Sequence, residues 1–249
     1  MFARAPALAL VALMGLTSIL SAQWVQPRTA PGAIGLSFLI AEPTGDFEQF
    51  VNTGYGGELT GRIPVDPMGV VSIRADLGWV IYGYESKRVC LSDAVGCRIQ
   101  NRLETLNNIF FGGVGPELAI PGRFARPYVN AFLGFGYFST ISNLEDWYYE
   151  DYGHTENLGD GTVSWGAGGG VELTLSRGRV PFYLNIGAKY HRNGLVEYLT
   201  EGDIVDHPDG SITLYPVQSQ ANLVTYRIGL TIGIGGGDDD DRHRGKRRR

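Results

Sequence analysis

The stretch of sequence that decides the fold is NLVTYRIGLTIGI, which runs from Asn222 to Ile234. Its even-numbered positions are Asn222 followed by six apolar or aromatic residues, Val224, Tyr226, Ile228, Leu230, Ile232 and Ile234. Its odd-numbered positions are mostly small or polar and include Arg227. Because successive side chains of a strand point to opposite faces, this segment is predicted to be a β-strand with one apolar and one polar face.

Seven further stretches alternate in a similar way, so the chain is predicted to form eight strands. They run near Gly32–Ile40, Thr53–Ile63, Gly69–Tyr82, Arg102–Leu118, Phe124–Ser139, Thr162–Leu175, Pro181–Arg192 and Ser219–Ile234. Short connections at 64–68, 120–123 and 176–180 alternate with longer ones that include 142–161 and 193–217. Turns and loops alternate in this way in an up-and-down barrel with both termini on one side. The predicted fold class is therefore all-β, an eight-stranded antiparallel up-and-down β-barrel.

The two faces of these strands predict that the barrel is transmembrane. The outward faces carry no charge and read Ile34, Leu36, Phe38, Ile40; Val71, Ile73, Ala75, Leu77, Trp79, Ile81; Val163, Trp165, Ala167, Gly169, Val171, Leu173; and Phe182, Leu184, Ile186, Ala188, Tyr190. The opposite faces carry Glu58, Arg62, Arg74, Asp76, Glu172, Lys189 and Arg227. These charges are too few for the surface of a soluble, lipocalin-like barrel. In lipid a closed barrel pairs every backbone polar group, so the charged face is predicted to line the lumen.

The lumen of an eight-stranded barrel is narrow enough for side chains to fill it. The seven charges are expected to form a salt-bridge network that plugs most of this space. The alternative is a narrow polar pore, because the lumenal glycines Gly166, Gly168, Gly170, Gly187 and Gly229 would free space. The strand at 102–118 does not resolve into clean faces.

Aromatic residues are concentrated near the predicted strand ends, as expected for the girdles at membrane interfaces. Toward the end with the long loops, the long-loop end, lie Trp79, Tyr82, Tyr84, Tyr137 and Trp165. Toward the opposite end, the short-turn end, lie Phe124, Tyr128 and Phe182. Aromatic residues scattered along strands are the alternative explanation.

The N-terminus predicts export. Arg4 precedes an apolar run at 7–19, and Leu20-Ser21-Ala22 ends in a small residue, so residues 1–22 are predicted to be a cleaved signal peptide. A retained membrane helix is the alternative, although the run is shorter than the roughly 20 residues that span a bilayer. The barrel is then expected over residues 23–235. The net charge of −5 gives no reason to expect nucleic acid as a partner.

Two cysteines, Cys90 and Cys97, remain in the exported chain. They enclose a small loop between two predicted strands, and an exported protein folds in an oxidising compartment, so a disulfide is predicted. Such a short ring contributes about 2.5 kcal/mol in the loop-entropy model. Free thiols are the alternative, and neither cysteine lies in a metal-ligand cluster.

Over residues 31–235 the chain resembles the small outer-membrane β-barrels, namely the OmpA-like transmembrane domain and the opacity-like porins. The resemblance rests on the architecture and on PYVNAFLGFG at 127–136, WGAGGGVE at 165–172 and YRIGLTIGI at 226–234. The last strand is similar to the segment that the barrel-insertion machinery reads, although the usual terminal aromatic is missing and a tail follows. The resemblance implies the outer membrane of a Gram-negative-type bacterium, with outer-membrane lipid and lipopolysaccharide as partners.

Catalysis is not expected. Small barrels that modify lipid A resemble one another in using a His with a nearby Ser and a carboxylate, whereas His191 is followed by Arg192 and Asn193. The sequence contains no Gly-x-Ser-x-Gly motif. No cofactor, resident metal or catalytic residue is predicted.

The long connections suggest an interaction site. Residues 142–161 combine acidic and aromatic side chains, and the interaction site is predicted at Asp146, Trp147, Tyr148, Tyr149, Asp151 and Tyr152. Such a rim is suited to cations, including divalent ions shared with lipopolysaccharide, or to a partner that contacts Tyr and Trp. A merely solvated loop is the alternative. The charge-blocked tail at 236–249 is predicted to be disordered and periplasmic.

These observations predict an integral outer-membrane barrel with a structural or weakly porin-like role, a charged lumen and acidic extracellular loops. The alternative is a surface adhesin or ligand-binding receptor that acts through the Tyr-rich acidic loop at 142–161.

Overall fold

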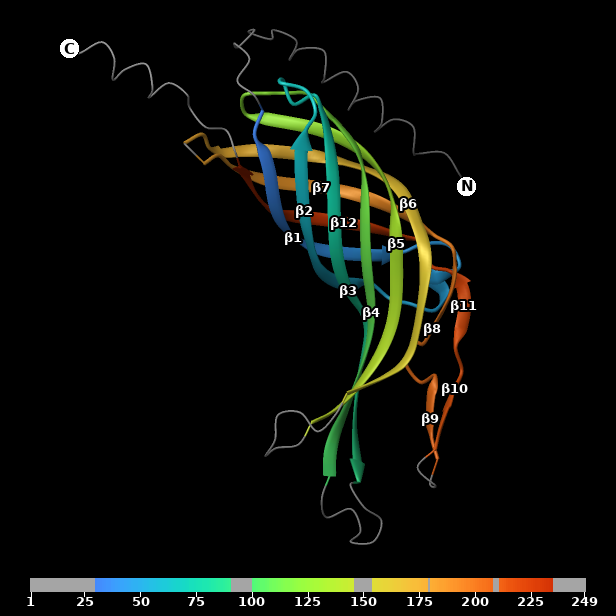
Figure 1. The fold of residues 1–249 in the computed structure, drawn as a ribbon. Coiled ribbons are helices and arrows are strands. Elements are labelled where there is room, and N and C mark those ends of the chain that lie inside the picture. The colour runs from blue at the N-terminus through green and yellow to red at the C-terminus, as the bar shows by residue number, and fades with distance from the viewer. Residues whose placement is uncertain (1–29, 91–99, 146–153, 179, 208–210, 235–249) are drawn as a thin grey trace, which may run out of the picture.

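A computed structural model describes residues 30–90, 100–145, 154–178, 180–207 and 211–234. Eight antiparallel strands form a closed barrel (Figure 1), which confirms the predicted fold class. They are β1 (Gly32–Pro43), β2 (Gly54–Pro64), β3 (Val71–Cys90), β4 (Gln100–Ala119), β5 (Ala125–Glu145), β6 (His154–Ser176), β7 (Phe182–Asn193) and β12 (Leu223–Ile234). Pairing of β1 with β12 closes the barrel, so its wall has no free edge in the region that all eight strands share.

The alternation seen in the sequence is preserved around the wall. On β1, for example, Leu36 is 69% exposed on the outside whereas Leu39 is completely buried inside. On β12 the side chains of Tyr226 and Ile228 are exposed while Arg227 between them is buried. The outside of the barrel is therefore apolar. The inside is polar in the part of the lumen that contains the charged residues.

Four strands are longer than the sequence predicted. β3 continues to Cys90 rather than ending near Tyr82, β5 continues to Glu145, and β6 begins at His154, so the range 142–161 is not entirely a loop. The prediction failed here because these extensions no longer alternate between apolar and polar residues. They pair with one another as hairpins beyond the barrel (Figure 1), and register shifts lie between Ile81 and Gly83 and between Thr140 and Ile141.

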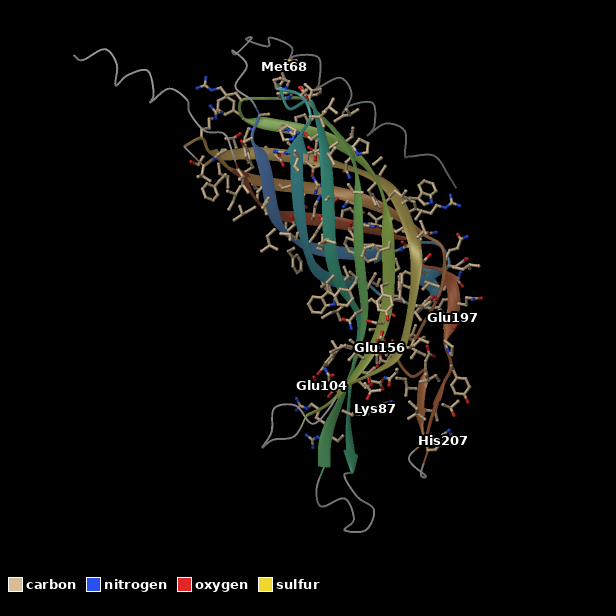
Figure 2. The ribbon with its side chains drawn as sticks, viewed as in Figure 1. Met68, Lys87, Glu104, Glu156, Glu197 and His207 are labelled. Atoms are coloured by element: carbon tan, nitrogen blue, oxygen red, sulfur yellow. The ribbon has the colours of Figure 1, made fainter. Side chains whose placement is uncertain are left out.

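Polar cross-strand contacts hold these extensions together. Tyr84 donates a hydrogen bond of 2.6 Å from its hydroxyl to Glu104, and this bond raises the pKa of Tyr84. The hydroxyl oxygens of Thr105 on β4 and Ser142 on β5 are hydrogen-bonded at 2.9 Å. Figure 2 shows Glu104 and Glu156 at this end of the molecule and Met68 at the opposite end.

The connection between β7 and β12 also contains short strands, although the sequence predicted a loop over residues 193–217. They are β8 (Leu195–Tyr198), β9 (Ile204–Asp206), β10 (Ile212–Leu214) and β11 (Val217–Gln220). β8 pairs with β11, and β9 with β10. The last barrel strand consequently begins at Leu223 rather than Ser219, because Ser219 pairs with Val196 of β8 instead. A short helix, η2 (Phe47–Gln49), lies in the connection between β1 and β2.

Several predictions concern residues outside the described part of the chain. These are the signal peptide at 1–22, the tail at 236–249, Cys97, and the loop residues Asp146, Trp147, Tyr148, Tyr149, Asp151 and Tyr152. Cys90 ends β3, and its side chain is likewise not described. No helix in the described ranges is long and apolar enough to cross a membrane.

Candidate functional site

Among the residues that the structure describes, nine charged side chains lie in the lumen, and we call them the ionic network. Five are cations and four are anions: Arg62, Arg74, Arg126, Lys189, Arg227, Glu58, Asp76, Glu117 and Glu172. The structure places all seven charges named from the sequence inside the barrel and connects them by ion pairs. Glu117 and Arg126 are additional members that sequence reasoning missed.

One part of the ionic network lies toward the short-turn end and joins β2, β4, β5 and β6. Glu172 accepts from Arg62 at 2.7 Å and from Arg126 at 3.1 Å. Glu117 is 2.8 Å from Arg126 and 3.1 Å from Arg74. Arg62 also lies 3.5 Å from Glu117, so Glu172 has two cationic neighbours and Glu117 has three, which offsets the cost of burying these carboxylates.

The other part of the ionic network crosses the lumen from β2 and β3 to β7 and β12. Lys189 donates to Glu58 at 2.8 Å and to Asp76 at 2.7 Å. Glu58 also accepts from Arg227 at 2.9 Å. Arg74 joins the two parts, because it pairs with Asp76 at 2.8 Å as well as with Glu117. Strands on opposite sides of the barrel are thus tied through its centre.

The lumenal glycines provide room for these long side chains rather than for a pore. A Cβ atom at Gly187 would come within 3.0 Å of Arg227 Nε, and one at Gly170 within 2.7 Å of the Tyr128 hydroxyl oxygen. The guanidinium of Arg227 lies 5.7 Å from the centre of the Tyr128 ring. The space that the pore alternative assigned to the missing side chains is therefore occupied at these two positions.

The two missed members of the ionic network follow from strict alternation. Counting by two from Phe111, which is buried, through Gly113 and Gly115 reaches Glu117. The glycines on this face and Pro116 beside it hide the pattern, because they carry no information about polarity. Counting back by two from Tyr128 reaches Arg126, which is close enough to the turn to be taken for a turn residue.

His191 follows Lys189 by two residues on β7 and is buried in the lumen. The centre of its ring lies 4.8 Å from that of Phe111 and 5.0 Å from that of Phe132. Its Nε2 atom is 3.1 Å from the Thr225 hydroxyl oxygen. In the described ranges no group of three or more His, Cys, Asp or Glu is arranged to hold a metal ion.

The long-loop end of the lumen is filled by four aromatic rings, Phe47, Tyr82, Phe138 and Tyr198, which we call the aromatic plug. Phe47 comes from η2 and Tyr198 from β8, and their rings meet edge to face at 5.0 Å. Phe47 also packs against Tyr82 at 6.0 Å and Phe138 at 5.9 Å. All four side chains are buried. The connection between β1 and β2 and the connection between β7 and β12 thus close the lumen at the long-loop end.

Apolar and hydrogen-bonding contacts fix the aromatic plug in place. Tyr82 donates to the carbonyl oxygen of Leu199 at 3.3 Å, and the Tyr198 hydroxyl is 2.9 Å from that of Ser219. Leu39, Val80, Ile109, Val196 and Leu223 complete the surrounding core. A cavity of about 10 Å³ lies beside Phe47, which is room for one water molecule at most.

The outside of the barrel carries exposed aromatic residues at both ends, but the predicted girdles need one correction. Trp79 and Trp165 are exposed at the long-loop end and Phe182 at the short-turn end, as a girdle requires. Tyr82 and Tyr128 are 8% and 3% exposed and point into the lumen. They occupy lumen-facing positions on their strands, so their position near a strand end was a misleading criterion.

These features define a class. Large apolar side chains cover the outside, charges are buried in the lumen, and the backbone is paired around a closed wall. In water such an exterior would cost hydrophobic free energy, whereas in hydrocarbon it is favoured. The chain is a transmembrane β-barrel of the outer-membrane type, since closed barrels of this construction belong to outer membranes.

Comparisons with known proteins give structural neighbours. No family model and no curated protein matches the chain. Neisserial surface protein A is similar with a TM-score of 0.49 and 10% identity, over 82% of this chain and 97% of that chain. The attachment invasion locus protein Ail of Yersinia pestis gives 0.45 and 11%, over 82% and 97%. The N-terminal β-barrel domain of OprF of Pseudomonas aeruginosa gives 0.32 and 13%, over 81% and 98%.

Proposed function

We propose that the protein is a structural outer-membrane barrel whose lumen is sealed at two levels and which conducts ions weakly or not at all. The observation that carries this proposal is the aromatic plug above the ionic network. An ion that crosses the lumen would have to displace four packed rings and also separate buried ion pairs. Removal of one partner from such a pair is costly because the other charge remains buried.

Single-channel recording in planar bilayers tests this proposal. We expect no discrete steps from the mature wild-type protein, and none from F47A or R227A alone, because each substitution leaves one level closed. The combined F47A/R227A variant opens both levels and is expected to conduct. F50A is the matched control for the plug, since Phe50 follows η2 but is 47% exposed. Wild-type steps that are cation-selective and altered by R227A would establish a pore and contradict the proposal.

The same placement in the membrane supports proposals about partners. Outer-membrane lipid and lipopolysaccharide would contact the apolar exterior, and the barrel-insertion machinery would act on β12 during assembly. Divalent cations would bind at the acidic loops, and Glu104 and Glu156 are acidic residues at this end of the molecule (Figure 2).

A second function, a surface adhesin or receptor, is favoured by the extension of β3 to β6 beyond the barrel. β5 extends to Glu145 and β6 begins at His154, so both flank the acidic, Tyr-rich residues 146–153. Replacement of residues 146–153 by a Gly/Ser segment of equal length tests this function. If the protein is a receptor, cells that produce the variant should lose adherence to an extracellular-matrix surface while the barrel stays folded. Unchanged adherence would exclude this stretch as the binding site.

A further inference from the structure

Two arginines at the short-turn end share one aromatic ring. Arg123 lies in the turn before β5, and Arg177 directly follows β6. Their guanidinium carbons lie 5.6 Å and 4.9 Å from the centre of the Phe124 ring. Arg177 also donates a hydrogen bond to the carbonyl oxygen of Arg123. Each contact is an ordinary cation–π pair, but together they hold two like charges around a single ring.

Neither guanidinium has an anionic partner among the described residues. The carboxylates of Glu117 and Glu172 at this end are buried and engaged by the cations of the ionic network. The carboxylate of Asp66 accepts from the backbone N–H groups of Met68 and Val71, and the bond from Val71 lowers the pKa of Asp66 most. Two cations that are held together without an anion repel each other, so the arrangement favours an anion from outside the described residues.

The position of the ring indicates where that anion comes from. Phe124 is 72% exposed at the rim of the barrel, next to the first residue of β5. The backbone N–H of Thr174 donates to the carbonyl oxygen of Phe124 at 2.9 Å, which fixes the two turns side by side. Leu175 and Phe182, both exposed and apolar, belong to the same rim. This rim therefore lies where the lipid-facing exterior ends, at the level of the lipid headgroups.

We propose that Arg123 and Arg177, held on the ring of Phe124, bind the phosphate of an anionic phospholipid in the leaflet at the short-turn end. Guanidinium groups match phosphate oxygens in pairs of parallel hydrogen bonds, which an ammonium does not. The Phe124 ring contacts the apolar region beneath the headgroup. This site is defined by one leaflet and one pair of turns, unlike general contact of a barrel with lipid. The inference rests on the membrane placement of the barrel and not on whether its lumen conducts.

Lipid selectivity of the reconstituted protein tests the site. The mature chain is placed in vesicles of phosphatidylcholine with spin-labelled phosphatidylglycerol, and the preference for the anionic lipid is measured by electron paramagnetic resonance. The R123Q/R177Q variant is expected to lose this preference by fivefold or more, because each of the two surface cations contributes about fivefold to the binding of an anionic lipid. R102Q/R192Q is the control with equal net charge, because it removes two exposed arginines from the long-loop end. R123K/R177K keeps the positive charges but cannot form the paired hydrogen bonds of a guanidinium group. Its preference for the anionic lipid should fall between those of these two variants.

The following results would contradict the proposed lipid site. An equal loss in R102Q/R192Q, or no loss in R123Q/R177Q, would overturn it. Abolition of the preference when inorganic phosphate replaces chloride at equal ionic strength would show free phosphate as the ligand and would also overturn the lipid assignment. Heat-modifiable electrophoretic mobility reports whether each variant is folded. If R123Q/R177Q does not fold, R123K/R177K carries the test, and wild-type selectivity in that variant would contradict binding by the guanidinium fork.

Discussion

At the scale of single residues, Glu58 is the centre of the ionic network. Its carboxylate is 2.8 Å from Lys189, 2.9 Å from Arg227 and 4.0 Å from Arg74, and the side chain is almost completely buried. Cations from three strands therefore depend on one carboxylate. This dependence makes the position a sensitive measure of how strongly the buried charges couple the two sides of the barrel.

We predict that E58Q lowers the free energy of unfolding by about 3–5 kcal/mol, because the substitution leaves Lys189 and Arg227 buried with too little negative charge. Urea titration of the protein in lipid vesicles measures this loss. E48Q is the control, since Glu48 lies on the exposed side of η2. The E58Q/R227Q double variant should be less destabilised than the sum of its single substitutions by about 1 kcal/mol or more. Strict additivity would show that the pair is not coupled.

Alternation at single residues also explains what the sequence could predict. It assigned Glu58, Arg74 and Arg227 correctly to the lumen, because their neighbours two positions away are polar or small. It gave no access to Phe47 or Tyr198, which lie outside the barrel strands and enter the lumen from loops. Local periodicity contains no information about which loop folds back, because that choice depends on the shape of the space left by other strands.

At the scale of elements, two hairpins at the long-loop end differ in how they relate to the core. The β3–β4 hairpin beyond Gly83 pairs with β5, but its described residues add no member to the ionic network or the aromatic plug. The β8–β11 hairpin, in contrast, supplies Val196 and Tyr198 to the core. The sequence pattern predicted neither hairpin, because both contain too few alternating apolar residues to be recognised as strands.

Shortening these hairpins should therefore have opposite results. If residues 85–105 are replaced by a short Asn-Gly turn, which suits a two-residue connection between the paired Tyr84 and Leu106, we expect the free energy of unfolding to change by only about 1 kcal/mol. The same replacement of residues 195–220 removes buried Tyr198 and Leu199 and should cost at least about 3 kcal/mol. Denaturant titration in vesicles measures both. Equal losses would mean that the β3–β4 extension contributes to the core.

At the scale of the whole molecule, the barrel combines a lipid-facing exterior with an interior closed by two unlike materials. Ion pairs fill the short-turn half and aromatic rings fill the long-loop half, while the outside keeps one apolar surface throughout. The strand order and most of the faces were predictable, because both follow from periods and loop lengths that recur along the chain, whereas the faces of the strand at 102–118 were not. The lengths of the extended strands were not, because outside the membrane the pairing partner rather than the solvent determines where a strand ends.

The membrane placement itself predicts how stability depends on depth. Leu36 pairs with Leu59 and Leu230 in the middle of the wall, whereas Ile63 is next to the last residue of β2. L36R should lower the free energy of unfolding in vesicles by about 2–4 kcal/mol, and I63R by about 0–1 kcal/mol, because the cost of a charge falls from the bilayer midplane to the interface. Both side chains are exposed, so neither substitution disturbs the lumen. Equal costs at the two positions, or no cost at Leu36, would be incompatible with a lipid-facing exterior.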